Sequence, residues 1–198
     1  MPGSKKKDDT KILATAMDLF AQKGFSKVTL AAVAKASGST LAEVKALYPT
    51  KEEMLIAAFR TGQKKMETRF RTILTGDLEA HVMEMFEGIK EGLMPYGSDV
   101  HLQLILQATE DRTLMEIIRR TSRNVNFAIK AYLSQMVALS IIDQVENVEK
   151  VNESMVTSFI EDMASTMEGK KLPAIKKNWV ARVKGMLSPS AKTTIPTQ

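Results

Sequence analysis

The sequence predicts an all-α protein of about nine helices. Apolar residues recur at helical spacing along most of its 198 residues, and no segment shows the two-residue alternation of a half-buried β-strand. Capping residues precede several of these segments, and glycine or proline follows them. No internal repeat is visible, so we expect an irregular helical fold and not a solenoid.

The composition is that of a soluble globular protein, with 44% apolar and 26% charged residues. The absence of cysteine excludes disulfides, thiolate metal sites and cysteine nucleophiles. No apolar run approaches the roughly 18 residues of a membrane span. The N-terminal MPGSKKKDD is not followed by the apolar segment of a secretory signal. We therefore expect a cytoplasmic protein without a membrane partner.

The net charge of +5 is unevenly distributed. Residues 1–75 hold 14 Lys and Arg against 7 Asp and Glu, residues 76–169 hold 7 against 16, and residues 170–198 hold 7 basic residues and no acidic one. A basic amino-terminal third before an acidic body is typical of a nucleic-acid-binding head on a separate scaffold. A solvated basic surface would give the same counts.

Two short helices joined by a tight turn are predicted after the first helix. Thr29 is the expected N-cap of the first of them. Gly38 then allows a sharp turn, and Thr40 with Glu43 forms a Thr-x-x-Glu capping box that begins the next helix. Pro49 ends this helix, because proline disfavours α geometry in the residue before it.

The other helices follow from their apolar stripes and from the residues that punctuate them. Thr50 and Glu53 form a second capping box, and Pro173 suits the first turn of a helix. Residues 1–8 and the Pro-, Thr- and Ser-rich residues 188–198 are expected to be disordered. We expect these further helices over residues 9–23, 50–74, 78–93, 100–108, 113–139, 148–167 and 173–187.

Two helices with a glycine-containing turn of about four residues have the helix-turn-helix spacing. Around this motif the sequence resembles the tetracycline-repressor (TetR) family of bacterial regulators. The resemblance covers roughly residues 10–59. It rests on Ile12-Leu13-x-x-Ala16-x-x-Leu19-Phe20, Gly24-Phe25, Val28-Thr29-Leu30, Val33-Ala34-x-x-Ser37-Gly38 and Tyr48-Pro49-Thr50-Lys51-Glu52-x-x-Leu55. One departure lies in the second short helix, where Ala42-Glu43-Val44-Lys45 replaces the family's small residue, Leu and Tyr.

The resemblance implies a dimeric DNA-binding transcriptional regulator that acts as a repressor. Its partners would be a near-palindromic operator in double-stranded DNA, a small apolar effector that releases the protein from it, and a second copy of the chain. No cofactor is expected. The implied domains are a disordered arm (1–8), a helix-turn-helix DNA-binding domain (9–50), a helical effector-binding and dimerisation domain (51–187) and a disordered tail (188–198).

Residues at the start of a recognition helix meet base edges, and flanking groups bind phosphates. The expected groove-facing residues are Thr40, Leu41 and Ala42. Glu43 is either the capping partner of Thr40 or a reader of cytosine N4. The expected phosphate contacts are Thr29, Lys45, Tyr48 and Lys51, where Lys45 stands in the place of the family's phosphate-binding Tyr. Tyr48 is alternatively an aromatic core residue, and Lys51 a solvated charge.

The middle helices must supply the effector pocket that the resemblance implies. Thirteen methionines suggest an adaptable interior. Plain core packing would account for each candidate taken singly. The candidates are Met83, Phe86, Ile89, Met94, Met115, Ile118, Phe127 and Tyr132, with Gln107 and Asn124 as polar contacts.

The last two helices carry the predicted dimer surface. Their apolar stripes suit a four-helix bundle between two copies. Few base-reading side chains are available, so two heads about 34 Å apart would be needed for affinity. The stripe residues are Val156, Phe159, Ile160, Met163, Ile175, Trp179 and Val183.

Two other classes of protein compete with a DNA-binding regulator. An enzyme would need a positioned nucleophile and base, but His81 and His101 lie on separate predicted helices without a catalytic motif. Two histidines and no cysteine also make a zinc site improbable. The stronger rival is a TetR-like helical protein that binds an apolar ligand or lipid without specific DNA binding. The unusual second short helix favours that alternative.

Overall fold

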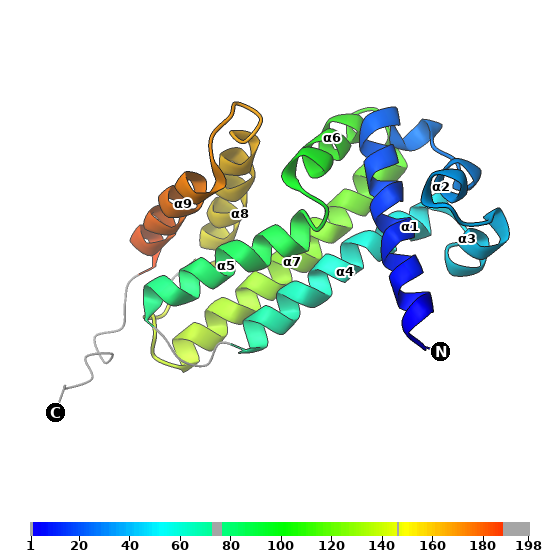
Figure 1. Cartoon of the computed structure of the whole chain (residues 1–198). Helices are drawn as coiled ribbons and strands as arrows, with labels where there is room; N and C mark the ends of the chain where they lie inside the picture. The colour runs from blue at the N-terminus through cyan, green and yellow to red at the C-terminus, as the bar shows by residue number, and fades with distance from the viewer. Residues whose placement is uncertain (1, 73–76, 146, 188–198) are drawn as a thin grey trace. The chain divides into compact units, whose positions relative to one another are not determined.

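The structure, a computed structural model, describes residues 2–72, 77–145 and 147–187, with side chains from residue 9 onward. Within these residues the chain forms nine α-helices and one 3₁₀ helix, without a β-strand, which confirms the predicted all-α fold (Figure 1). The helices are α1 (Pro2–Lys23), η1 (Phe25–Lys27), α2 (Leu30–Ser37), α3 (Leu41–Leu47), α4 (Lys51–Thr72), α5 (Leu78–Leu93), α6 (Ser98–Ala108), α7 (Arg112–Ala138), α8 (Val148–Ala164) and α9 (Leu172–Met186).

The largest difference from the predicted elements is at the amino terminus. Helix α1 begins at Pro2, whereas the sequence predicts a disordered arm over residues 1–8 and a helix from about Asp9. Proline is favourable in the first turn because the N–H that it lacks has no intrahelical acceptor there. The three lysines that follow are good helix formers. The predicted tail, 188–198, lies outside the described residues.

The chain divides into two compact units. Unit 1 comprises residues 1–62 and 93–122, and so contains α1 to α3, α6 and the first parts of α4 and α7. Unit 2 comprises residues 63–92 and 123–198, with α5, α8, α9 and the remaining parts of α4 and α7. The units therefore divide the chain within two long helices, and not at the end of the helix-turn-helix motif.

The core of unit 1 fixes the three amino-terminal helices and η1 around a few buried side chains. Phe20 of α1 and Phe25 of η1 meet edge to face with ring centroids 5.0 Å apart. Val33 of α2 and Val44 of α3 have no exposed surface. Helix α1 packs against both α2 and α6, so α6 supports the helices that carry the predicted DNA contacts.

The core of unit 2 is built on aromatic side chains. Phe86 of α5, Phe159 of α8 and Trp179 of α9 pack edge-on, with centroids 5.2 to 6.0 Å apart. The indole N–H of Trp179 donates to the carbonyl of Met155 at 3.2 Å. Helices α4 and α5 approach closely at Gly88, where an added Cβ would lie 2.4 Å from the ring of Phe70. None of the described helices is long and apolar enough to span a lipid bilayer.

Candidate nucleic-acid interface

The turn between α2 and α3 has the geometry that its sequence predicts. Thr29 is the N-cap of α2 and accepts a hydrogen bond from the N–H of Ala32 at 3.2 Å. Gly38 ends α2 in the left-handed region with φ 76°, which glycine adopts without the steric cost of a Cβ. The N–H of Ser39 then donates to the carbonyl of Ala34 at 3.0 Å. The direction in which α3 leaves the turn is therefore fixed by the backbone.

The first turn of α3 is closed by the predicted capping box. The Thr40 hydroxyl accepts from the Glu43 N–H at 3.2 Å, and the Glu43 carboxylate accepts from the Thr40 N–H at 2.8 Å. The same carboxylate accepts the hydroxyl proton of Thr40 at 2.8 Å. Hydrogen bonds from the Thr40 backbone and side chain lower the pKa of Glu43. The capping interpretation of Glu43 is confirmed, and Thr40 has no proton left to donate to a base or phosphate.

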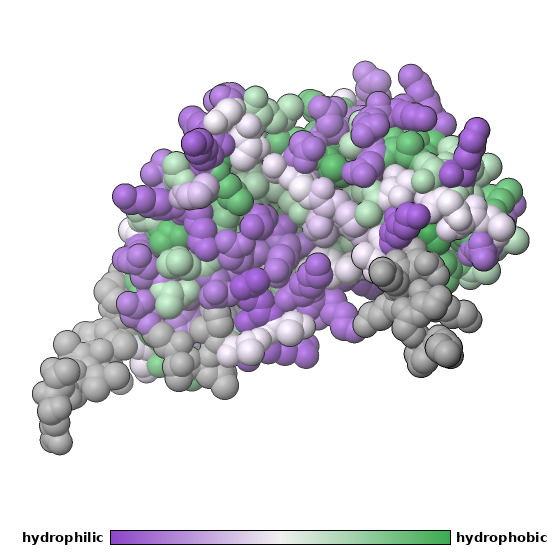
Figure 2. Space-filling model, viewed as in Figure 1, coloured by the Kyte–Doolittle hydropathy of each residue, from purple (hydrophilic) through white to green (hydrophobic). Residues whose placement is uncertain are grey.

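The outer face of α3 is exposed and partly apolar. Of its seven residues only Val44 is buried. Leu41 keeps 39% and Leu47 46% of its surface exposed, and Ala42 and Lys45 are exposed beside them. The space-filling view shows hydrophobic residues reaching the surface over α2 and α3 (Figure 2). The outer face of α3 thus presents two leucines and the cation of Lys45 to the outside.

Tyr48, a predicted phosphate contact, is buried and points into unit 1. It is 8% exposed, and its hydroxyl donates a hydrogen bond to the carboxylate of Asp9 on α1. Burial and this hydrogen bond raise the pKa of Tyr48. The alternative interpretation, an aromatic residue that closes the core, fits this position, because its side chain connects the end of α3 to α1.

Lys51, another predicted phosphate contact, holds η1 against the start of α4. Its ammonium donates to the carbonyls of Phe25 at 2.8 Å and Ser26 at 3.1 Å and lies 4.6 Å from the Phe25 ring centroid. These contacts leave one N–H of the ammonium for an outside acceptor. Lys51 is therefore a residue that positions the head and has limited capacity for phosphate.

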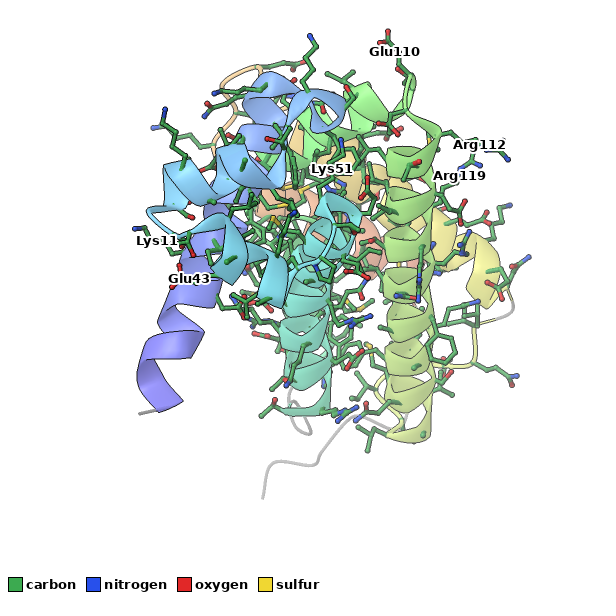
Figure 3. The ribbon with its side chains drawn as sticks, turned by 90° about the vertical axis from the view of Figure 1, so that its right-hand side faces the viewer. Lys11, Glu43, Lys51, Glu110, Arg112 and Arg119 are labelled. Atoms are coloured by element: carbon green, nitrogen blue, oxygen red, sulfur yellow. The ribbon has the colours of Figure 1, made fainter. Side chains whose placement is uncertain are left out.

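The fold brings a cation to the turn that the sequence does not identify. Lys11 of α1 lines a cleft of about 510 Å³ together with Gly38 of the turn and Glu43 of α3. Its ammonium lies 3.8 Å from the position that a Cβ on Gly38 would occupy. Figure 3 shows Lys11 and Glu43 near one another at the edge of the head. No local pattern marks Lys11, because the turn lies 27 positions further along the chain.

The ten predicted effector contacts divide between the two units. Met94, Gln107, Met115 and Ile118 belong to unit 1, whereas the other six belong to unit 2. Phe86, Ile89 and Tyr132 are buried side chains within unit 2, Met83 is 40% exposed, and Phe127 is 73% exposed. Phe127 therefore does not line an enclosed pocket; its position on α7 is outside the stripe of buried residues that includes Val125 and Ile129.

The two predicted polar contacts have other partners. Gln107 of α6 donates from Nε2 to the carbonyls of Phe20 at 3.0 Å and Ala21 at 3.3 Å, and its Oε1 accepts from the N–H of Phe25 at 2.8 Å. It thus satisfies backbone groups at the end of α1 and at the start of η1. The exposed Asn124 donates to Gln63 at 3.3 Å.

The predicted dimer stripe packs inside its own chain. Six of its seven residues are at most 7% exposed, and Ile160 is half-buried. An amphipathic pattern shows that a face is covered, but not whether the covering residues come from the same chain. Here α5 covers it through Phe86, which contacts both Phe159 and Trp179. These stripe residues therefore belong to the core of unit 2, and a dimer contact of α8 and α9 would use other side chains of these helices.

Both histidines are buried, and each packs against an aromatic ring. Nδ1 of His81 is 2.7 Å from the Tyr132 hydroxyl, and His101 packs edge-on against Phe59 at 6.0 Å. Burial lowers the pKa of His101 to about 4, so its imidazole is neutral at pH 7. Within the part of the chain that the structure describes, no three His, Asp or Glu side chains are grouped to hold a metal.

A capped short helix after a glycine turn, on an all-helical body, has the arrangement of the helix-turn-helix class of proteins. Residues 12–58 match the family model described as bacterial regulatory proteins, tetR family. This match confirms the resemblance to the TetR family. A search of curated protein sequences found no match.

Solved structures of the same fold cover nearly the whole chain. GusR from Salmonella enterica superposes with a TM-score of 0.70 at 16% identity, covering 91% of this chain and 95% of that one. A TetR transcription regulator from Haloarcula marismortui gives 0.67 at 18%, covering 92% and 100%. A transcriptional-regulator candidate from Saccharomonospora viridis, solved in complex with choline, gives 0.67 at 14%, covering 92% and 98%. The chain thus has the fold of TetR-type DNA-binding transcription regulators.

Proposed function

We propose that the chain is a homodimeric repressor that binds a near-palindromic operator through α3 and is released by a small apolar effector. The observation that carries the proposal is the exposed face of α3. Leu41, Ala42 and Lys45 point outward from a helix whose first turn is already closed by Thr40 and Glu43. Apolar side chains at the start of such a helix suit contact with thymine methyl groups, and Lys45 suits a phosphate.

Further support comes from the cations around the turn. Lys11 joins Lys45 on exposed positions of unit 1, and Thr29 keeps a hydroxyl proton because it only accepts from Ala32. The N-terminus of α2 adds free backbone N–H groups near Thr29. The proposed operator is thus read by few base contacts and held by several phosphate contacts, which is why two heads are needed.

The dimer is proposed to form through the outer faces of α8 and α9. The lysines of α9 pair with α5 or line the surface toward it, which leaves Ala174, Asn178 and Arg182, at i, i+4 and i+8, on the other face of α9. In a two-fold dimer this face would meet the same region of the partner. The exposed Ala174 allows the close approach of a partner helix. Ala174→Arg should dissociate the dimer in sedimentation velocity, and Ala131→Arg, an exposed alanine on α7, should not.

The effector is proposed to bind within the helical body and to favour a dimer whose heads are wrongly spaced. Such a ligand lowers DNA affinity by its differential affinity for the two states. The choline-bound neighbour of the same fold supports a small-molecule site in this fold. Candidate compounds should release a labelled duplex in anisotropy measurements, and Tyr132→Phe should change that release while leaving duplex affinity unchanged.

Selection of bound fragments from a random duplex pool tests the DNA-binding proposal directly. A repressor should enrich one near-palindromic sequence, and its log affinity should fall steeply with log salt concentration. A slope near zero without a preferred sequence would overturn the proposal. That result would instead favour the TetR-like ligand carrier, an alternative supported by the small number of base-reading side chains on α3.

A further inference from the structure

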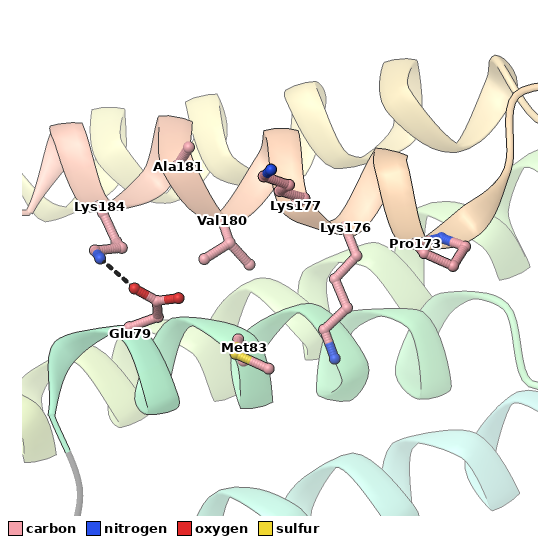
Figure 4. Close-up of a pocket in the computed structure, with 8 residues that line it drawn as sticks. All are labelled: Glu79, Met83, Pro173, Lys176, Lys177, Val180, Ala181 and Lys184. Carbon is pink, nitrogen blue, oxygen red and sulfur yellow. Dashed lines mark hydrogen bonds and ion pairs between the residues drawn. The ribbon is translucent and has the colours of Figure 1, made fainter.

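A groove of about 440 Å³ lies on the surface of unit 2 between α5 and α9 (Figure 4). Its α9 side runs from residue 173 to residue 184 at helical spacing, so these residues share one face of α9. This face is about 16 Å long at 1.5 Å per residue. The volume falls within the roughly 300–1,000 Å³ of small-molecule sites. A face of this length on one helix is too small to supply the roughly 800 Å² that a folded protein partner covers.

The middle of the groove is apolar. Met83 of α5 and Val180 of α9 point toward one another across it (Figure 4). Met83 keeps 40% of its surface exposed, whereas Val180 is buried to 6%. Methionine is unbranched and adapts to irregular shapes. An alkyl chain that lay between the two side chains would remove the exposed surface of Met83 from water.

The two ends of the groove differ in charge. At one end Lys184 pairs with Glu79 at 2.5 Å, one cation with one carboxylate. At the other end Lys176, at 2.8 Å, shares the Glu87 carboxylate with Lys90, at 2.6 Å.

Lys177 also lines the groove, and no acidic group of the described residues pairs with it. Lys90, Lys176 and Lys177 thus bring three cations to this end, where the Glu87 carboxylate pairs with the first two. Burial would raise the pKa of Glu87, but the hydrogen bonds from Lys176 and Lys90 outweigh it and lower the pKa. The carboxylate is ionised, and the end still has an excess of positive charge that a second anion would neutralise.

We propose that this groove binds a medium-chain fatty acid. Its carboxylate pairs with Lys176 and Lys177, and its alkyl chain lies between Met83 and Val180 toward Lys184. The excess of cations at one end selects an anionic head, and the apolar middle selects an unbranched tail. The site goes beyond the proposed function, because it lies on the surface of unit 2 and does not depend on DNA binding by the head.

Calorimetric titration of the full chain with dodecanoate, below its micelle concentration and without DNA, tests the site. We expect one molecule to bind per chain, and dodecyltrimethylammonium, which has the same tail and a cationic head, not to bind. The double variant Lys176→Gln/Lys177→Gln should lose at least tenfold in affinity, while Glu87 keeps Lys90 as its partner. Met83→Ser should lose affinity severalfold. The matched control is Lys150→Gln, an exposed lysine of α8, which should bind as the unaltered chain does.

Three results would overturn the inference: no heat of binding with dodecanoate, equal binding of the cationic amphiphile, or unchanged affinity in the double lysine variant. Near-ultraviolet circular dichroism of Trp179, the single tryptophan, which lies on α9, verifies that each variant is folded. Because no duplex is present, failure here leaves the DNA-binding proposal standing. Failure of the duplex selection likewise leaves this site standing.

Discussion

Helices α3 and α9 are both predicted to contact a partner, but the apolar residues predicted for this role are exposed on α3 and buried on α9. On α3 one residue of seven, Val44, is buried, and the rest of the surface faces outward. On α9 four residues, including Trp179 and Val183, pack inside the chain. Both helices are amphipathic in sequence. The difference shows that side chains packed in the chain's own core are not available for contact with a second molecule.

Length explains much of this contrast. A helix of seven residues is not stable alone, so α3 depends on its caps and on one buried anchor. A helix of fifteen residues presents a full stripe that must be covered, and α5 covers it within the same chain. The exposed residues of α3 are therefore little constrained by packing, whereas those of the α9 stripe are fixed by it.

The largest expected difference in unfolding free energy is between truncation of a buried side chain on α9 and truncation of an exposed side chain on α3. Trp179→Ala should lower the free energy of unfolding by about 3–5 kcal/mol, because it removes a buried ring. Leu41→Ala should change it by no more than about 0.5 kcal/mol, because the side chain is exposed. Chemical denaturation of both variants measures the difference. Equal losses would mean that α3 is packed as tightly as α9.

Acidic pH should lower the free energy of unfolding, because a buried histidine of unit 1 takes up a proton more readily in the unfolded chain. The pKa of His101 is lowered to about 4 by burial, from an ordinary value of 6.5. Because the folded pKa is depressed, the unfolded chain binds the proton first, so stability is complete above pH 6.5 and falls as the pH approaches 4. The loss from this group is roughly 3 kcal/mol. His101→Phe should flatten that part of the curve of unfolding free energy against pH; an unaltered slope would show that another group causes it.

A smaller change in stability is expected when a methyl group is added at two glycines of unit 2, one packed against a neighbouring helix and one exposed. Gly88→Ala places a methyl group against the rigid ring of Phe70 and should cost about 1–3 kcal/mol. Gly185→Ala meets nothing within 4 Å and should stabilise α9 by up to about 1 kcal/mol, because alanine has the higher helix propensity. Thermal unfolding of the two variants should therefore shift in opposite directions. A shift in the same direction would contradict the close approach of α4 and α5.

The smallest change in stability is expected for a substitution on α3, whose effect is measured as a change in duplex binding. Lys45→Ala should leave the unfolding free energy within about 0.5 kcal/mol and reduce the salt slope of duplex binding by about 1. Lys35→Ala on α2 is the matched control, because that lysine is also exposed. Anisotropy titrations at several salt concentrations measure both slopes. Equal slopes for the two variants would remove Lys45 from the phosphate contacts.

The sequence predicted what is set locally. The stripe of α1, the Thr29 cap, the Gly38 turn and the box of Thr40 with Glu43 each depend on residues within four positions of one another. Periodicity and capping chemistry suffice for such features, because the partner is always close in the chain. The nine helices follow from the same signals, with boundaries displaced mostly by one to three residues.

Roles that depend on distant partners could not be predicted in this way. Tyr48 meets Asp9, Lys51 meets Phe25, and Gln107 meets the end of α1, at separations of 39, 26 and up to 87 positions. Each side chain is a reasonable ligand or phosphate contact by type. Only the tertiary fold shows that these polar groups form hydrogen bonds with distant parts of the same chain. For the same reason, the apolar stripe of α9 predicts a covered face, but only the fold shows that α5 of the same chain covers it.

The closed capping box has a consequence for the energetics of recognition. Ordering a residue costs about 1–2 kcal/mol of conformational entropy, and a helix that folded only on its target would lose this at every position. In α3 the hydrogen bonds between Thr40 and Glu43 hold the first turn in advance. In the proposed DNA complex a helix formed in advance would lose little conformational freedom, so association with the duplex should be fast.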